Sequence, residues 1–470
     1  MKLRYNNKVL FLGIIFLGIL NSCKKDWLDA KPSKSLVIPT TIADYQAILD
    51  NASSTTDYGF NVDQPSLDEI SAGDFYMTDA NWNSREPFER NTYVWASGGL
   101  YGGSTLVLDW NGPYKKIFNA NVVLEGIEKI TAENGNDQIS KNDVKGAALF
   151  FRAYEHYSVA QLFCKPFSTS TANTDLGIPL RLTSDFSAGS IRSTVRETYD
   201  QIISDLKQAK VLLPVELPNT LVYKNRPTKA ATDAMLARVY LAMSNYDSAF
   251  KYANNCLQKH NLLMDYNNNP PVNPSSLTPF QRFNDEVIFQ KLLIFYSEFA
   301  ASRLIADTTL YNSYDANDLR KTCFFRLRQG VYTYKGSYDP SFVPFSGLAT
   351  DEIYLIRAEC NARLGNTVAA LQDLNTLLIT RWKTGTFVPF TAADANDALR
   401  KVLVERKKEL CFRGIRWSDL RRLNMDPQFA ITLTRKVNNQ TYTLPPNDQR
   451  YVLPIPDYVI QLSGIQQNPR

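Results

Sequence analysis

Aromatic side chains are concentrated in residues 74–110, DFYMTDANWNSREPFERNTYVWASGGLYGGSTLVLDW, which hold three of the chain's six tryptophans. Sugar rings bury their flat C–H faces against rigid aromatic planes, and their hydroxyl groups need directional hydrogen-bond partners. The interleaved polar residues offer such partners, and the four glycines between positions 98 and 103 let the backbone approach a ligand closely. We therefore predict a binding loop for a saccharide, with candidate contacts at Trp82, Asn83, Arg85, Trp95 and Tyr101.

The tryptophans of this segment differ in their surroundings. Trp82 lies in a polar run, and we expect it to be the exposed platform. Trp110 precedes Asn111-Gly112-Pro113 and a predicted helix, and we expect it in the core. The alternative is that several of these aromatics fill the core beneath a long loop.

No group of residues has the spacing of a catalytic or metal site. The two histidines, His156 and His260, fall on separate expected helices, and His156 is expected in the core. No Gly-x-Ser-x-Gly elbow or phosphate-binding loop occurs. Carboxylates such as Asp74, Asp79 and Asp109 are plentiful, so a glycosidase remains an alternative that needs two of them in one cleft. We expect no catalytic residue, no cofactor and no metal.

The N-terminus has the composition of a secretory signal. Lys2, Arg4 and Lys8 precede an uncharged stretch that is too short to span a bilayer, and small residues then lead to Cys23. This arrangement resembles a bacterial lipoprotein signal, which implies removal of residues 1–22 and lipid attachment at Cys23. The alternative is an ordinary signal peptide with an incidental cysteine.

Charge and cysteine content narrow the classes of partner. Loss of residues 1–22 removes three basic residues and no acidic one, so the formal net charge falls from +5 to +2. A chain this close to neutral, without a basic run, does not indicate a nucleic-acid partner.

No two of the remaining cysteines form a C-x-x-C pair, and we interpret them as small core residues: Cys164, Cys256, Cys323, Cys360 and Cys411.

Hydrophobic periodicity predicts a mostly helical chain, with helices over 115–131, 143–164 and 194–213. Thr194 and Glu197 have the spacing of a capping box at the start of the third helix. Residues 262–290 and 321–348 are rich in turn formers, and we expect loops there with short strands at 287–290 and 331–335.

Two segments, near 228–258 and 351–381, have the pattern of tetratricopeptide helix pairs. In both, two small residues lie twelve positions apart, at Ala237 and Ala249 and at Ala358 and Ala370. Because 121 residues separate the two segments, we do not expect a continuous array.

Residues 404–422, VERKKELCFRGIRWSDLRR, combine arginines and glutamates at helical spacing. We expect a solvated or partly buried structural brace, with Gly414 ending a helix in the left-handed conformation and Trp417 anchoring the next turn.

This block also resembles the C-terminal signature of the SusD/RagB family of outer-membrane nutrient-binding lipoproteins. Further segments resemble the family in the same order along the chain: CKKDWLD at 23–29, LFCKPF at 162–167, GIPL at 177–180, RPTKAATDAMLARVYLAM at 226–243, DEIYLIRAE at 351–359 and YVLPIPDYVIQLSGIQQNPR at 451–470. Arg413 and Tyr458-Val459 depart from the family's usual acidic residues.

The resemblance implies one SusD-like domain over 23–470: a tetratricopeptide-like helix-pair scaffold with a loop-rich ligand-binding face and few strands. It implies a lipid-anchored protein on the outer membrane, facing the exterior. The implied function is non-catalytic capture of a nutrient glycan for a SusC-like TonB-dependent transporter. Family members often place ligand contacts in the segment that matches 295–303, which adds Tyr296 and Arg303 to the candidates. The alternatives are a peptide-binding RagB-like protein, a surface glycosidase and a purely structural lipoprotein.

Overall fold

A computed structural model of the protein describes residues 39–51, 60, 62–217, 224–300 and 302–470. The expected signal peptide, residues 1–22, and the expected lipid attachment at Cys23 lie outside these residues. Residues 42–470 form one compact unit. Across the described part of the chain, no helix combines the length and the apolar character needed to cross a membrane.

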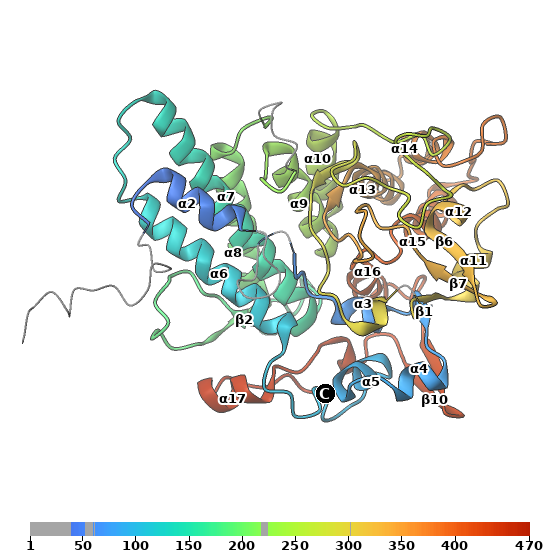
Figure 1. Ribbon diagram of the computed structural model, residues 1–470, viewed down its shortest axis with the longest axis horizontal. Helices are drawn as coiled ribbons and strands as arrows, with labels where there is room; N and C mark the ends of the chain where they lie inside the picture. The colour runs from blue at the N-terminus through green and yellow to red at the C-terminus, as the bar shows by residue number, and fades with distance from the viewer. Residues whose placement is uncertain (1–38, 52–59, 61, 218–223, 301) are drawn as a thin grey trace, which may run out of the picture. The chain divides into compact units, whose positions relative to one another are not determined.

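A row of eight helices forms the scaffold, and each helix in the row contacts the next (Figure 1). In order these are α6 (Leu108–Ile127), α7 (Gly135–Phe163), α8 (Val195–Leu212), α9 (Lys229–Ala242), α10 (Tyr246–Leu257), α13 (Thr350–Arg363), α14 (Thr367–Ile379) and α15 (Ala395–Glu409). The mostly helical fold that the sequence predicts is confirmed.

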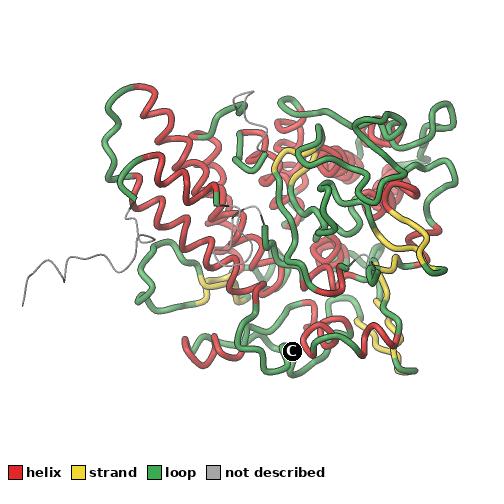
Figure 2. Tube along the Cα trace, viewed as in Figure 1, coloured by secondary structure: helices red, strands yellow, loops and turns green. Residues whose placement is uncertain are grey.

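Shorter elements connect and flank this row. The helical ones are α2 (Ile42–Asp50), α3 (Leu67–Ala72), α4 (Asp79–Asn83), α5 (Pro87–Tyr93), η2 (Ser297–Phe299), α11 (Thr308–Asn312), α12 (Arg320–Phe324), α16 (Arg416–Leu423), η3 (Gln449–Tyr451) and α17 (Asp457–Ser463). Long loops and most of the short strands gather on the side of the scaffold away from α6 and α7, whereas the strand over Leu176–Pro179 lies against α7 (Figure 2).

Within the described residues, ten short strands form one four-stranded sheet and three two-stranded pairs. The antiparallel sheet has the order β1 (Phe75–Tyr76), β5 (Ile305–Ala306), β7 (Val331–Tyr334) and β6 (Phe325–Arg328). The pairs join β2 (Leu176–Pro179) to β3 (Arg192–Thr194), β4 (Val287–Phe289) to β8 (Leu348–Ala349), and β9 (Leu433–Val437) to β10 (Gln440–Leu444). The strands expected at 287–290 and 331–335 are β4 and β7.

Both predicted tetratricopeptide-like pairs are present, as α9 with α10 and α13 with α14. Their four signature alanines are fully buried, which allows the paired helices to approach closely. Because many residues separate the two pairs in sequence, we expect them not to form a continuous array. In the folded chain, however, the pairs are adjacent, because α10 packs directly against α13. The intervening residues leave the row as loops and strands and return to it at Thr350.

Helix boundaries differ from expectation at two N-termini. Helix α6 begins at Leu108 and contains Pro113 as its sixth residue, where proline lacks the N–H that would donate to the Asp109 carbonyl. Helix α7 begins at Gly135, where the Asn134 side chain accepts hydrogen bonds from two backbone N–H groups. At α8 the expected capping box is confirmed: the Thr194 hydroxyl accepts from the Glu197 N–H, and the Glu197 carboxylate accepts from the Thr194 N–H.

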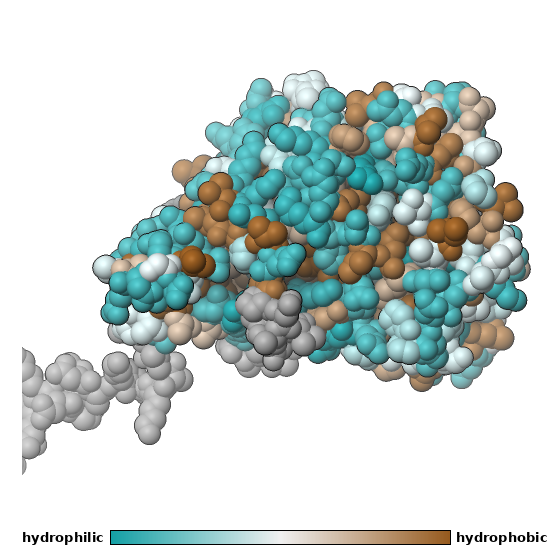
Figure 3. Space-filling model, turned by 90° about the horizontal axis from the view of Figure 1, so that it is seen from above, coloured by the Kyte–Doolittle hydropathy of each residue, from teal (hydrophilic) through white to brown (hydrophobic). Residues whose placement is uncertain are grey.

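The core contains the residues expected there. Trp110, Trp417 and His156 are buried, and burial lowers the pKa of His156 to about 3. The five cysteines from Cys164 to Cys411 are buried and free. On the face seen in Figure 3, hydrophilic residues predominate and hydrophobic ones are scattered among them in small groups.

The charged residues of the C-terminal third form a buried network, which corrects the expectation of a solvated or partly buried brace. Arg320 donates to Asp318, Glu405 and Glu409, and Arg381 donates to Glu286 and Glu409. Further buried pairs join Arg238 to Glu352, Arg406 to Asp419, Arg413 to Asp351 and Arg422 to Glu359. Gly414 is left-handed as expected, but it lies in the turn that follows Leu410, the C-cap of α15.

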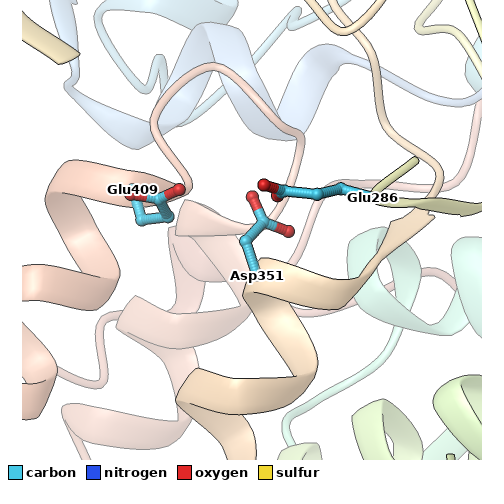
Figure 4. A group of neighbouring side chains, drawn as sticks. All are labelled: Glu286, Asp351 and Glu409. Carbon is cyan, nitrogen blue, oxygen red and sulfur yellow. The ribbon is translucent and has the colours of Figure 1, made fainter. Parts of the chain in front are cut away.

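Three carboxylates of this network lie together and point toward one another (Figure 4): Glu286, Asp351 and Glu409. Their nearest oxygens all lie within 4.8 Å of one another, a spacing that could suit a metal ion. Each carboxylate, however, accepts from a buried arginine: Glu286 and Glu409 from Arg381, and Asp351 from Arg413. The guanidinium groups already supply the positive charge that a metal would bring, so we interpret the group as part of the brace.

We expect Arg381→Met to destabilise the protein by about 3–5 kcal/mol, because it leaves the buried Glu286 and Glu409 carboxylates without their shared partner. Arg400→Met is the control, because the Arg400 side chain is half-exposed in its pair with Asp397. This substitution should lower the free energy of unfolding by at most about 1 kcal/mol. Urea unfolding at pH 7 measures both. Equal losses in the two variants would contradict the role given to Arg381.

Candidate functional site

The two segments with candidate ligand contacts, 74–110 and 295–303, lie side by side. Strand β1 pairs with β5, so Phe75 faces Ala306 and Tyr76 faces Ile305. The Asp307 N–H donates to the Asp74 carbonyl at 2.8 Å. This backbone pairing brings together two segments that lie more than 200 residues apart in the sequence. Neither segment alone indicates that they are neighbours.

Side chains continue this contact beyond the strands. The Arg85 guanidinium donates to the Ser297 hydroxyl. The Glu89 carboxylate accepts from the Ser297 N–H at 3.2 Å and from its hydroxyl at 2.9 Å. The rings of Phe88 and Tyr296 meet edge to face, with centroids 5.2 Å apart. Helix α5 and η2 are therefore held in a fixed relation.

Asp109 joins a third element to this site. Its carboxylate accepts from the Ser66 and Leu67 N–H groups at 2.6 and 2.8 Å and from the Tyr296 hydroxyl at 2.5 Å. Burial raises the pKa of Asp109, and the hydrogen bond from Tyr296 opposes that rise. One buried carboxylate thus connects the start of α3 and the start of α6 to Tyr296. This hydrogen bond explains why the Tyr296 hydroxyl points into the protein.

We use the name platform patch for the partly exposed side chains that surround this junction: Trp82, Asn83, Phe88, Arg90, Phe295 and Tyr296. The Trp82 ring is half-buried, its indole N–H donates to the Arg90 carbonyl at 3.3 Å, and the Arg90 guanidinium lies 5.6 Å from the ring centroid. Phe295 is 50% exposed. Rigid aromatic planes beside polar groups are the surfaces on which sugar rings pack.

The segment around Trp82 is more ordered than the predicted loop. Residues 79–83 and 87–93 form α4 and α5, and the irregular stretch is confined to 94–107. Gly102 in that stretch is left-handed, and a Cβ at this position would lie 2.7 Å from the Pro87 Cβ, so only glycine fits there.

Asn83 is exposed, but its amide is already paired. It donates to the Asn438 side chain at 3.1 Å and accepts from it at 2.9 Å. Asn438 and Asn439 have left-handed conformations at the tip of the β9–β10 hairpin, which thereby contacts α4. A ligand at Asn83 would have to share or displace this amide pair.

The structure corrects the prediction for Trp95 and Tyr101. Trp95 is 2% exposed and Tyr101 is 5% exposed. The Arg435 guanidinium lies 4.6 Å from the centroid of the Trp95 ring and 3.8 Å from that of Tyr93. The Tyr101 hydroxyl donates to the Pro454 carbonyl at 2.6 Å. Both rings therefore fill the core, as the alternative for this segment proposed.

Arg85 and Arg303 act within the scaffold. Arg85 is 8% exposed and donates to the Asn81 carbonyl and to the Ser84 and Ser297 hydroxyls. Arg303 is half-buried and donates to the Ser297 carbonyl at 3.1 Å. Both candidate arginines thus donate hydrogen bonds to Ser297. These bonds stabilise the turn that carries Phe295 and Tyr296.

Two carboxyl groups meet beneath the patch, Glu89 of α5 and Glu298 of η2. Burial, together with the hydrogen bond to Glu89, raises the pKa of Glu298 to about 9. Burial also acts to raise the pKa of Glu89, but hydrogen bonds from Glu298, Glu86 and Ser297 outweigh it and lower that pKa. The pair shares one proton in direct contact, whereas glycosidase carboxyl groups stand about 5–10 Å apart around a substrate. This geometry gives no support to the glycosidase alternative at this position.

Sequence reasoning missed Ser297, Glu298 and Arg435. Ser297 and Glu298 lie inside the expected segment, but nothing in a serine or glutamate alone indicates that it faces Glu89. Arg435 stands more than 300 residues from the rings that it covers. Only the paired asparagines at 438–439 gave a local signal, because they favour a tight hairpin turn.

Two family models match the chain. One, described as starch-binding and associating with the outer membrane, matches residues 26–241, and the SusD family model matches residues 350–470. Residues 295–303 lie between the two matched ranges. No curated protein matches the chain.

Solved structures from Bacteroides share the fold. A Bacteroides vulgatus protein provisionally described as sugar binding has a TM-score of 0.72 at 20% identity, over 92% of this chain and 99% of its own. A SusD superfamily protein of Bacteroides thetaiotaomicron has 0.71 at 23% identity, over 92% and 100%. A SusD-like carbohydrate-binding protein of Bacteroides vulgatus has 0.67 at 22% identity, over 90% and 97%.

The shared proton of Glu89 and Glu298 should make stability depend on pH. The folded protein retains the Glu298 proton up to about pH 9, whereas the unfolded chain loses it near pH 4.5. Stabilisation by this group is therefore complete below pH 4.5 and is lost as the pH rises toward 9. In Glu298→Gln the amide keeps a donor for Glu89 but does not titrate. Between pH 5 and 8 we therefore expect the free energy of unfolding of the variant to rise relative to that of wild type, by up to about 1.4 kcal/mol per pH unit.

Urea unfolding at several pH values measures this difference. The exposed Glu133→Gln is the control and should follow wild type throughout. If the free energy of unfolding varies with pH in the same way for Glu298→Gln and wild type, Glu298 is ionised in the folded protein and the prediction is wrong.

Proposed function

The chain belongs to the SusD/RagB family, and on that basis we propose that it binds a nutrient glycan at the cell surface without catalysing its conversion. The observation that carries the proposal is the platform patch, where the half-buried Trp82 ring lies among polar side chains. The description of the family model as starch-binding supports a carbohydrate ligand. The solved relative described as carbohydrate-binding agrees with that choice.

We further propose that the protein is held at the outer membrane by lipid on Cys23 and delivers its ligand to a SusC-like TonB-dependent transporter. The family model's description of an association with the outer membrane supports this location. The transporter is an inference from family membership. A gene for a TonB-dependent barrel beside the gene for this chain, and co-purification of the two proteins, would test it.

Trp82→Ala should weaken binding by about 1–3 kcal/mol of affinity, because it removes the aromatic plane on which a sugar ring packs. Its melting temperature should fall only slightly, since the ring is already partly exposed. A carbohydrate array on the soluble chain beginning at Lys24 supplies the ligand, and calorimetric titration supplies the affinity.

The matched control is Trp95→Ala, a tryptophan of the same segment that is buried against Arg435. This change should cost about 3–5 kcal/mol of stability through the cavity that it leaves. Unchanged affinity in Trp82→Ala, or a loss of stability as large as that of Trp95→Ala, would contradict the platform role.

Cys23→Ala should abolish metabolic labelling with a radioactive fatty acid and leave an unprocessed precursor, because the thiol is the expected site of lipid attachment. The chain that begins at Lys24 should purify without detergent. Label that persists in the variant, or that is absent from wild type, would disprove the lipoprotein assignment.

A further inference from the structure

A cavity lies away from the platform patch. It has a volume of about 610 Å³ and opens between the loop that follows α7, the end of α16, the η3 turn and the C-terminal segment. Its wall includes Ser168, Thr171, Asn424, Gln449, Tyr451 and Gln466. The volume lies within the range of small-ligand sites. Half of the residues that line the cavity carry a hydroxyl or carboxamide group, although apolar atoms supply most of its surface. None of its residues is a candidate contact of the platform patch.

Lys165, Asp175 and Asp448 of the cavity wall have partners of opposite charge, whereas Arg421 bonds to backbone carbonyls. Lys165 pairs with Asp175 at 2.7 Å, and Asp448 pairs with Arg450 at 2.8 Å. The Arg421 guanidinium donates to the Gln161 and Cys164 carbonyls at the end of α7. Within the described residues no carboxylate pairs with Arg421, and its buried Nε has no hydrogen-bond partner, so Arg421 adds an N–H donor to the wall.

Two further buried polar atoms of the wall have unused hydrogen-bonding capacity. Tyr451 and Asn424 are each 3% exposed, and neither the Tyr451 hydroxyl nor Asn424 Nδ2 makes a hydrogen bond of normal geometry within the described residues. Burial raises the pKa of Tyr451, and the adjacent Asn424 side chain opposes that rise. A buried polar group without a partner costs free energy, which a ligand hydroxyl that bonds to it would recover.

We propose that this cavity binds a neutral saccharide, as a second site that is distinct from the platform patch. A sugar hydroxyl both donates and accepts, which matches the hydroxyl of Tyr451, the N–H of Asn424 and the carboxamides of Gln449 and Gln466. Leu176, Val452 and Pro469 supply apolar surface for the C–H face of the ring. The proposal rests on the proposed function only for the class of ligand.

The test uses the soluble chain beginning at Lys24 with Trp82→Ala, so that the titration reports on the cavity alone. The probes are neutral trisaccharides of glucose, xylose, mannose or galactose, and the neutral peptide tetraalanine. Tyr451→Phe should weaken binding of one trisaccharide about 3- to 10-fold, the effect of one lost hydrogen bond. Its fold should persist, because the ring still packs on Trp417 at 4.7 Å.

Two further variants make the result specific. Gln449→Trp places an indole at the exposed rim and should abolish binding. Tyr442→Phe removes a tyrosine hydroxyl that donates to Gln440, outside the cavity, and should change nothing.

The outcomes separate this proposal from the proposed function. Trisaccharide binding that requires Trp82 and is unaffected by Tyr451→Phe and Gln449→Trp would overturn the cavity site and leave the platform patch standing. Binding that Gln449→Trp abolishes and Trp82→Ala does not alter would support the cavity and contradict the patch. Binding of tetraalanine alone would overturn the saccharide class, and absence of any saccharide binding to wild type would overturn both proposals.

Discussion

The buried guanidinium–carboxylate network is the constraint on which the rest of the structure depends. Arg320 and Arg381 join the loops around Asp318 and Glu286 to Glu405 and Glu409 of α15. Arg238 and Arg422 connect α9 and α16 to α13 in the same way. Each bond is directional, and an unpaired buried charge is very costly, so the network tolerates few alternative packings. It fixes long, irregular loops against the helical row, in addition to the aromatic side chains of those loops that share its hydrophobic core.

The platform patch is a consequence of that fixed frame. Once residues 286–293 are held in place, the adjoining chain is positioned for the pairing of β5 with β1 and for the Tyr296–Asp109 hydrogen bond. Ser297 and the proton shared by Glu89 and Glu298 then hold α5 against η2. A ligand would meet side chains that are already ordered, which reduces the entropy lost on binding.

The helical scaffold could be predicted because its signals are local. The twelve-residue alanine spacing placed α9 with α10 and α13 with α14, and the Thr194–Glu197 spacing placed the start of α8. The site could be predicted only in part. The sequence indicated that 74–110 and 295–303 carry ligand contacts, but the exposure of each ring depends on distant partners. Arg435 covers Trp95, and Pro454 receives the hydroxyl of Tyr101, so two chemically suitable residues are core. The burial of the arginines at 406–422 likewise depends on distant carboxylates, which are Asp351, Glu352 and Glu359 of α13 and Asp74.

A crystal structure of the soluble chain with a bound oligosaccharide tests the central claim most directly, which is that a rigid patch around Trp82 recognises a sugar. The account predicts a sugar ring packed against the Trp82 indole, between α4 and η2, with its hydroxyls at Arg90 or the Asn83–Asn438 pair and with the Phe88–Tyr296 contact unchanged. An oligosaccharide bound elsewhere, with the Trp82 ring bare, would contradict it.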